Sequence, residues 1–170
     1  MNNAIEIETR LFADDGRTPN NPRLPLVVVR RASMVSEPAD WFEQQFISSN
    51  WRGCWRWTVY PYHHFHSTNH EVLGVSRGTA SLMFGGEQGE EFKVKVGDVI
   101  VIPAGVSHKR VDGSDDFQVV GAYPDGKEPD LILPGYDLEA ARRRIAHVAF
   151  PEQDPVFGVG GPLFDHWKNA

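Results

Sequence analysis

Three histidines and one glutamate lie in the middle of the chain, at spacings that suit a metal site. His64 and His66 are two residues apart, Glu71 follows closely, and His108 comes from a separate segment. Because successive side chains on a β-strand point to opposite faces, His64 and His66 would point to the same side. Neutral imidazoles and one carboxylate suit Fe, Mn, Ni, Co, Cu or Zn. The sequence therefore predicts one divalent transition metal bound by these four residues.

Four protein ligands would leave part of the metal's coordination sphere free. An ion with six ligands would keep two positions for water, substrate or dioxygen, and an open position distinguishes a catalytic from a structural site. A metal there could polarise a carbonyl oxygen or lower the pKa of a bound water. The residues thus favour a catalytic site over a purely structural one.

Three residues near the predicted ligands are candidates for substrate contacts: Tyr60, Tyr62 and Arg110. Arg110 lies two residues after His108, so on a strand it would share that face and could pair with a carboxylate or phosphate. An exposed arginine near the barrel mouth fits the sequence equally well. Alternation points His63 and His70 away from the ligands, although His63 could contact a ligand residue or the substrate.

Short runs that alternate apolar and polar residues surround the histidines and predict a β-sheet protein. We expect strands at about 26–31, 51–60, 71–78, 79–84, 91–96, 99–102, 107–111 and 117–123. A helix begins near Pro38 and carries an aromatic stripe, and a second runs roughly from Leu138 to Val148. We expect one domain over residues 1–170, with an N-terminal arm (1–25), a barrel (about 26–124) and a C-terminal helix and tail (125–170).

The segment from Trp51 to Tyr60 is rich in aromatic residues. Strand alternation, continued through Pro61 to the histidines, predicts that Tyr60 faces the barrel interior together with Arg56 and Thr58. Trp55 and Trp57 would then face outward, under a helix, the arm or a partner subunit.

Composition excludes several classes of function. The 170 residues are 41% hydrophobic and 24% charged, with a net charge of −6, so no basic excess exists to neutralise a nucleic acid. The single cysteine, Cys54, allows no intrachain disulfide. The N-terminus lacks the pattern of a secretory signal, and no apolar run approaches the ~20 residues that cross a bilayer. We therefore expect a cytoplasmic protein that binds neither nucleic acid nor membrane.

The two histidine clusters resemble the two motifs of the cupin superfamily. The first motif is represented by His64, His66, Glu71 and Gly78, and the second by Gly97, Pro103, Gly105, His108 and, in place of the usual asparagine, Asp112. Thr58 stands where the first motif begins with glycine. The resemblance implies a mainly β, double-stranded β-helix (jelly-roll) barrel with one or two flanking helices, and His64, His66, Glu71 and His108 as metal ligands.

A narrower resemblance covers nearly the whole chain. Segments that are similar to the YjlB-like group of bacterial cupins are 14–16, 19–22, 60–64, 121–124, 154–158 and 161–163. This resemblance implies the same fold and the same metal ligands, and it implies no particular substrate.

Two functions remain open from the sequence. One is a small metal-dependent enzyme of the dioxygenase, oxidase or isomerase type that acts on a small polar molecule. The other is a non-catalytic cupin that binds a sugar or another small molecule, because no separate acid, base or nucleophile stands beside the ligands. We also expect a homodimer, since exposed sheet edges need cover and many cupins pair.

Overall fold

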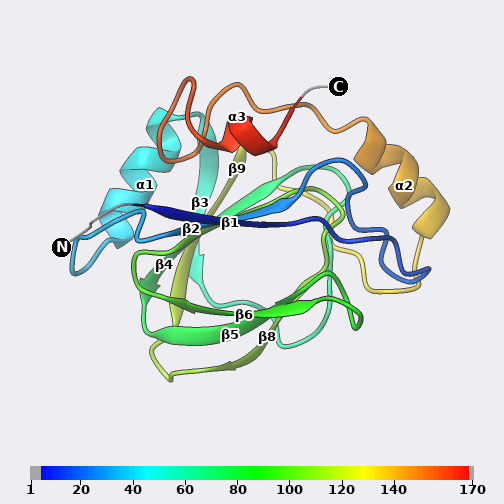
Figure 1. Cartoon of the computed structure of the whole chain (residues 1–170), viewed down its shortest axis with the longest axis horizontal. Helices are drawn as coiled ribbons and strands as arrows, with labels where there is room; N and C mark the ends of the chain where they lie inside the picture. Colours follow the sequence, from blue (N-terminus) through cyan, green and yellow to red (C-terminus); the bar gives the residue numbers. More distant parts are fainter. Residues whose placement is uncertain (1–4, 169–170) are drawn as a thin grey trace.

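The computed structural model describes residues 5–168 and consists of two facing antiparallel sheets with helices outside them (Figure 1). The elements are β1 (Glu6–Arg10), β2 (Leu26–Arg30), α1 (Ala39–Ser48), β3 (Trp51–Trp57), β4 (Glu71–Arg77), β5 (Thr79–Phe84), β6 (Glu90–Lys95), β7 (Val99–Ile102), β8 (His108–Gly113), β9 (Gln118–Pro124), α2 (Leu138–Ala146) and α3 (Leu163–His166). The six-stranded sheet has the order β1-β2-β7-β4-β9-β3, and the three-stranded sheet has the order β6-β5-β8. The predicted mainly β, double-stranded β-helix fold is confirmed. Residues 1–4 of the predicted arm and 169–170 of the predicted tail lie outside the described residues.

The six-stranded sheet separates two hydrophobic cores. On β2, Leu26 and Val28 belong to the core between the two sheets, whereas Val27 and Val29 belong to the core beneath the helices. A strand that is buried on both faces reads as a continuous apolar run, which explains the sequence Leu-Val-Val-Val at this position. We call the core between the sheets the inner core; its residue Phe84 packs against the His108 ring, with ring centroids 6.2 Å apart.

Helix α1 lies on the outer face of the six-stranded sheet, next to α3 (Figure 1). Phe42 and Phe46, four residues apart, share one side of the helix and stack with ring centroids 5.7 Å apart. Both are fully buried, as the predicted aromatic stripe requires. Trp167 in the tail joins the same core and donates from Nε1 to the Pro25 carbonyl at 2.8 Å.

The predicted arm is more ordered than its turn-rich sequence indicates. Residues Glu6–Arg10 form β1, an edge strand that pairs with β2. Asn20 is fully buried: its Nδ2 donates to the carbonyls of Ala13 and Gly85, and its Oδ1 accepts from Ser107 N. The polar turn residues thus hydrogen-bond to the backbone at one end of the barrel, a role that short-range patterns do not reveal.

The predicted orientation of β3 is wrong. Trp55 packs against the inner core, whereas Arg56 points outward and pairs with Asp40 and Glu43. A bulge between Arg52 and Trp55 shifts the pairing with β9. The strand then ends at Trp57, and an irregular segment follows before the histidines. Alternation cannot be carried across such a segment, so counting back from the histidines gave the wrong face.

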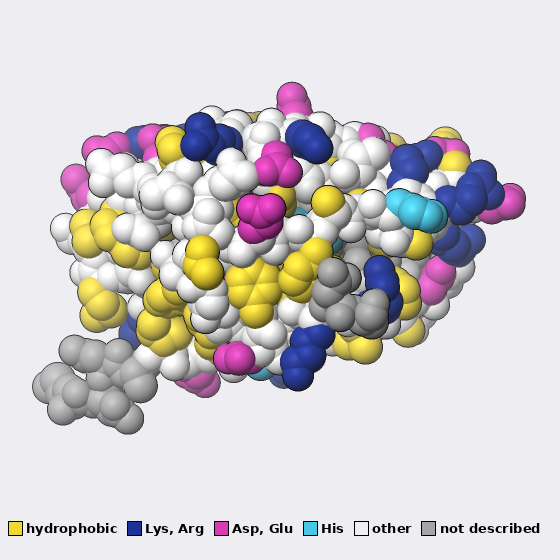
Figure 2. Space-filling model, turned by 90° about the horizontal axis from the view of Figure 1, so that it is seen from above, with side chains coloured by type: hydrophobic (Ala, Val, Ile, Leu, Met, Phe, Trp, Pro, Cys, Tyr) yellow, Lys and Arg dark blue, Asp and Glu magenta, His cyan; other side chains and the backbone are white. Residues whose placement is uncertain are grey.

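The outer surface mixes charged and apolar side chains. Figure 2 shows the face that carries α1 and α3, with hydrophobic side chains gathered across its middle. Within residues 5–168, no helix has both the length and the apolar character needed to span a membrane.

Candidate metal centre

The three histidines converge inside the barrel. His64 and His108 are directly opposite each other: His64 N donates to His108 O at 3.2 Å, and His108 N donates to His64 O at 2.9 Å. Their ring centroids are 4.1 Å apart, and each is about 5.5 Å from the His66 ring. One ring nitrogen of each histidine lies within 4.8 Å of those of the other two. The fold therefore brings together the three imidazoles that the sequence spacing predicted as metal ligands.

Glu71 completes the cluster from the first residue of β4, where it pairs with Ile102 of β7. Its Oε1 lies 3.3 Å from Nε2 of His108 and 3.7 Å from Nε2 of His66. Glu71 and His108 are almost completely buried. A carboxylate so far from water needs a positive partner, and here the facing atoms are imidazole nitrogens.

Hydrogen bonds at the far side of each ring orient the imidazoles. Nδ1 of His64 lies 3.1 Å from Tyr62 O, Nδ1 of His66 lies 2.5 Å from Asp130 O, and Nδ1 of His108 lies 3.1 Å from Val106 O. A carbonyl oxygen only accepts, so each Nδ1 carries a proton and donates it. In a neutral imidazole the lone pair then remains on Nε2, the atom that faces the cluster. This arrangement is typical of histidines that bind a metal.

The electrostatics of the cluster favour a bound cation. Burial, reinforced by the nearby His108, lowers the pKa of His64 to about 2, so this imidazole stays neutral. Burial also opposes charge on Glu71 and His66, but the attraction between the two groups outweighs it. The pKa of Glu71 is therefore below its usual range and that of His66 above it. In the metal-free protein, at a pH below the raised pKa of His66, a proton on His66 balances the carboxylate, and a divalent ion can replace that proton.

Comparison with known proteins shows the family. No family model matches the chain. The chain is 42% identical to the uncharacterized protein YjlB of Bacillus subtilis (strain 168) over 163 residues, which cover 95% of this chain and 97% of the relative. The chain belongs to the YjlB-like family of cupins.

Solved structures give more distant matches. The TDP-quinovose 3,4-ketoisomerase WlaRB of Campylobacter jejuni is 12% identical, with a TM-score of 0.41 over 53% of this chain and 73% of that one. A double-stranded β-helix protein of Klebsiella pneumoniae is 16% identical, with a TM-score of 0.39 over 78% of this chain and 81% of that one. At these identities and scores, neither match assigns a reaction to this cupin.

Asp130 links the metal cluster of this YjlB-like cupin to its C-terminal part. Its carbonyl holds His66, while its carboxylate accepts from the backbone N–H groups of Ser67 at 2.7 Å and Thr68 at 3.2 Å. The Ser67 hydroxyl donates to the same carboxylate and accepts from Arg144 of α2. Asp130 is 64 residues from His66 in the sequence, and the residues next to it in the sequence do not predict that it orients a histidine.

A cavity of about 450 Å³ opens beside the four predicted ligands. Beyond those ligands it is lined by Gly53, Trp55, Trp57, Thr58, Val59, Tyr60, Leu73, Tyr123, Gly126, Glu128, Pro129 and Leu131. Tyr60 lies there, as we expected from the sequence. The two tryptophans, Tyr123 and Glu128 were not among the predicted site residues. Alternation along residues 117–123 would have placed Tyr123 on the inner face, on the same side as Gly121 and Val119.

The other candidates lie outside this cavity. Tyr62 stacks on Tyr60 with ring centroids 4.9 Å apart but lines a separate hollow together with His63. Arg110 donates from Nε to the Val59 carbonyl at 3.2 Å. His70 is buried, accepts from Ala104 N at Nδ1, and packs against Trp167. Substrate contacts by Tyr62 and Arg110 therefore stay predictions, without support from the cavity lining.

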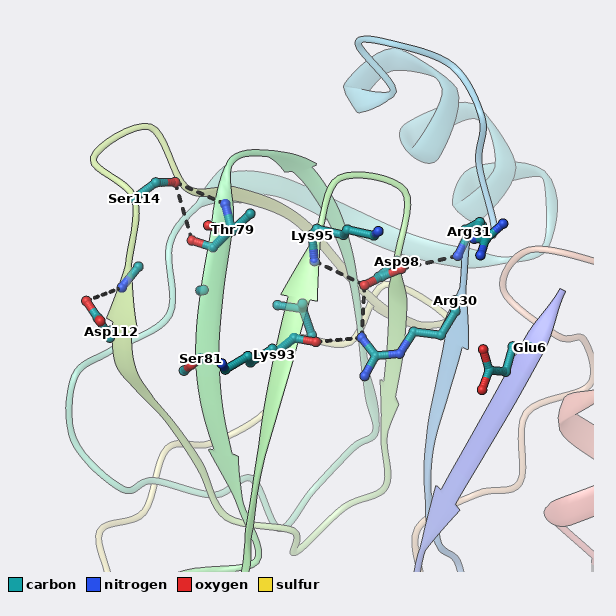
Figure 3. Close-up of a pocket in the computed structure, with 13 residues that line it drawn as sticks. Glu6, Arg30, Arg31, Thr79, Ser81, Lys93, Lys95, Asp98, Asp112 and Ser114 are labelled. Carbon is teal, nitrogen blue, oxygen red and sulfur yellow. Dashed lines mark hydrogen bonds and ion pairs between the residues drawn. The ribbon is translucent and has the colours of Figure 1, made fainter. Parts of the chain in front are cut away.

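A second hollow, of about 700 Å³, lies on the outside of the barrel (Figure 3). We call it the outer cleft; it is lined by Glu6, Arg30, Arg31, Thr79, Ala80, Ser81, Lys93, Val94, Lys95, Asp98, Asp112, Gly113 and Ser114. Its central contact is an ion pair of 3.0 Å between Arg30 and the buried Asp98. Arg30 also donates to the Lys93 carbonyl at 2.6 Å, which ties β2 to β6.

Proposed function

We propose that this cupin is a small metal-dependent enzyme of the dioxygenase, oxidase or isomerase type that acts on a small molecule. His64, His66, Glu71 and His108 would hold one divalent transition metal, either Fe, Mn, Ni, Co, Cu or Zn. The observation that carries the proposal is the set of three imidazoles, two buried and that of His66 partly buried, each with Nδ1 donating to a carbonyl and Nε2 directed at the others. Such a set directs three Nε2 atoms and the Glu71 carboxylate at one place, where a metal would bind once the proton that His66 shares with Glu71 is displaced.

The adjoining cavity gives a substrate access to this centre. A bound metal would supply Lewis-acid chemistry, polarising an oxygen atom of the substrate or activating a bound water. The Tyr123 hydroxyl accepts from Trp55 Nε1 at 2.8 Å, so its own proton is left for Glu71 or for a molecule in the cavity. Burial, together with the Glu71 carboxylate, raises the pKa of Tyr123, which keeps that proton in place at neutral pH.

Metal content tests the proposal directly. Protein purified without oxygen, stripped with a chelator and reloaded with each of the six metals should bind about one equivalent of at least one of them. His108→Ala should lose that metal while its circular dichroism spectrum stays that of the parent. Dioxygen uptake and product analysis on panels of small molecules then test turnover. Failure of all six metals to bind or to raise the melting temperature would refute the proposal.

A non-catalytic cupin that binds a sugar or another small molecule is the second candidate. Among the described residues that line the cavity, none beyond the four ligands is a histidine, cysteine, lysine or arginine. Such a wall offers few groups for acid–base catalysis. A compound that raises the melting temperature of the metal-loaded protein and is recovered unchanged after long incubation would favour this candidate.

Homodimerisation and a cytoplasmic location also belong to the proposal. Several apolar side chains are exposed on the described surface, including Met34 at 71% and Val159 at 83%. Exposed apolar surface of this kind is consistent with association between copies. Light scattering coupled to size-exclusion chromatography would measure the mass in solution, and a monomer at micromolar concentration would contradict the expected dimer.

A further inference from the structure

The walls of the metal cavity are mostly aromatic and apolar. Trp55, Trp57, Tyr60 and Tyr123 contribute four rings, and Val59, Leu73, Pro129 and Leu131 contribute apolar side chains. Apart from the metal ligands, the polar groups of the lining side chains are those of Thr58 and Glu128, two tyrosine hydroxyls and two indole N–H groups, of which that of Trp55 already donates to Tyr123. A sugar or a polyol needs a hydrogen bond for nearly every hydroxyl that it buries, and this lining offers few.

The aromatic rings are fixed in position without a ligand. Trp55 lies across Gly121 of the neighbouring strand, where a Cβ would overlap its indole ring. The same indole donates to the Tyr123 hydroxyl. Trp57 packs edge to face against Tyr60, with ring centroids 5.0 Å apart. Rings that are held in this way lose little conformational entropy when a flat molecule binds against them.

Apart from the proposed metal and the histidines that would hold it, the charged side chains that line the cavity are all acidic. The two acidic side chains in its lining are those of Glu71, beside the histidines, and Glu128, an exposed residue of the segment after β9. Among the described lining residues there is no lysine or arginine, and the nearby Arg110 directs its Nε to a backbone carbonyl. Apart from the metal itself, a carboxylate or phosphate on the substrate would therefore meet Glu128 without a counter-charge, whereas an amine would gain from Glu128 and from the aromatic faces.

We propose that the substrate is a small aromatic molecule with an oxygen donor at one end and a cationic amine, or an uncharged group, at the other. This inference rests on the proposed metal function, since the oxygen donor is directed at the metal. It narrows the small polar molecule expected from the sequence to one with an apolar body. It also favours a charge opposite to that of the carboxylate or phosphate with which Arg110 could pair, a role that the sequence left open beside that of an exposed arginine.

Three matched catechols test the charge preference. The Zn²⁺-loaded protein is titrated with 4-(2-aminoethyl)catechol, 4-ethylcatechol and 3-(3,4-dihydroxyphenyl)propionate, which share one ring and differ in the charge of the side chain. We expect the amine to bind about tenfold more tightly than the acid, with the neutral compound between them, because an exposed ion pair and a cation–π contact each add a modest amount. Calorimetry gives the Kd, and metal content is measured on the same samples.

Two variants connect the result to the cavity. Glu128→Gln should remove most of the preference for the amine and leave the affinity for 4-ethylcatechol unchanged. Glu91→Gln, an exposed glutamate of β6 that does not line the cavity, is the matched control and should keep the full preference. Trp57→Ala should weaken all three catechols about fivefold, because Trp57 is half exposed and its loss removes ring contacts rather than the core.

The outcomes separate this inference from the proposed function. If the protein holds Zn²⁺ but binds the acid as tightly as the amine, the substrate inference is overturned and the metal site stands. The inference also fails if Trp57→Ala leaves all three affinities unchanged. If no metal binds, both proposals are overturned together.

Discussion

The metal cavity and the outer cleft both contain buried charge, and they differ in how that charge is satisfied. In the outer cleft, Asp98 accepts from Arg30 at 3.0 Å, from Lys95 N at 3.0 Å and from Arg31 N at 3.2 Å (Figure 3). Its two oxygens thus share three donors. In the metal cavity, Glu71 faces His66 and His108, whose Nδ1 protons are already given to carbonyls.

This contrast separates a structural cluster from a binding site. Buried charges that meet enough donors hold elements together, as Arg30 and Asp98 hold β2 against the turn before β7. A buried carboxylate among imidazoles whose Nδ1 protons already bind carbonyls needs a positive charge beside it, which is either a proton on His66 or a metal ion. The larger hollow therefore belongs to the framework of the barrel, and the smaller one is the candidate for chemistry.

The contrast is tested most strongly by removal of a predicted ligand. His64→Ala should weaken metal binding more than about 100-fold, because changes in groups that only orient a ligand already cost 10- to 100-fold. His63→Ala is the matched control: it removes the neighbouring imidazole, which lines a separate hollow, and should retain the metal. Competition against a chromogenic chelator measures both affinities. Equal losses in the two variants would show that the cluster is not the metal site.

Protons compete with the metal, so affinity should depend on pH. The pKa of His66 lies above its ordinary value of 6.5 and that of Glu71 below its ordinary value of 4.5. In the metal-free protein, the contribution of Glu71 to stability is present above pH 4.5 and is lost as the pH falls through its lower folded value. The contribution of His66 is fully present below pH 6.5 and is lost as the pH rises through its raised value.

Metal binding must displace the His66 proton, and so it follows the opposite trend. Below the raised pKa of His66, affinity should increase about tenfold per pH unit, and it should level off above that pKa. The difference in Tm between metal-loaded and metal-free protein should grow over the same range. Paired melting curves between about pH 5 and 8 measure it. A difference that shrinks as the pH rises would contradict the assignment of His66.

Asp130 should have a smaller effect, because it acts on a ligand through the backbone. Asp130→Ala removes the acceptors that fix the segment at Ser67 and Thr68, and with them the position of the carbonyl that holds His66. We expect metal affinity to fall about tenfold. Asp130→Asn keeps an oxygen for the two backbone N–H groups and should lose much less. If the alanine variant is less stable but keeps the parent affinity, Asp130 is only a structural residue.

The sequence could predict that the side chains of the four predicted ligands lie together because their signal is local. Two histidines two residues apart share a face of any extended segment, and the second cupin motif supplies His108 at a fixed distance from its glycines. The groups that orient the rings carry no such signal. They are backbone carbonyls of Tyr62, Val106 and Asp130, and every residue has a carbonyl.

The cavity wall was harder to predict than the ligands because it depends on long-range pairing. The bulge in β3 determines that Trp55 faces inward, and Trp57, although half exposed, lines the same cavity. The position of Trp55 further depends on Gly121, which is its partner only after β3 has paired with β9. Sequence patterns therefore predicted the fold and the cluster of His64, His66 and His108, but they did not predict the aromatic wall of the space beside it.

Substitutions in the outer cleft should have the smallest effect on metal affinity. Asp98→Ala removes the buried carboxylate that pairs with the Arg30 guanidinium. It should lower the free energy of unfolding by about 3 kcal/mol. Glu8→Ala removes the more exposed partner of the same arginine, 3.0 Å away, and should cost less than about 1 kcal/mol. Chemical denaturation measures both.

In either variant that remains folded, metal affinity should stay within about twofold of the parent, because sites without shared partners act independently. The position of Asp98 makes this a demanding test. It lies next to Gly97 in the second cupin motif, and its carbonyl accepts from Val75 N, so it contacts the same strand, β4, that begins with Glu71. If Asp98→Ala weakened metal binding tenfold at a temperature where the protein is folded, the outer cleft would be coupled to the metal cavity through β4, and the two hollows would form one functional unit.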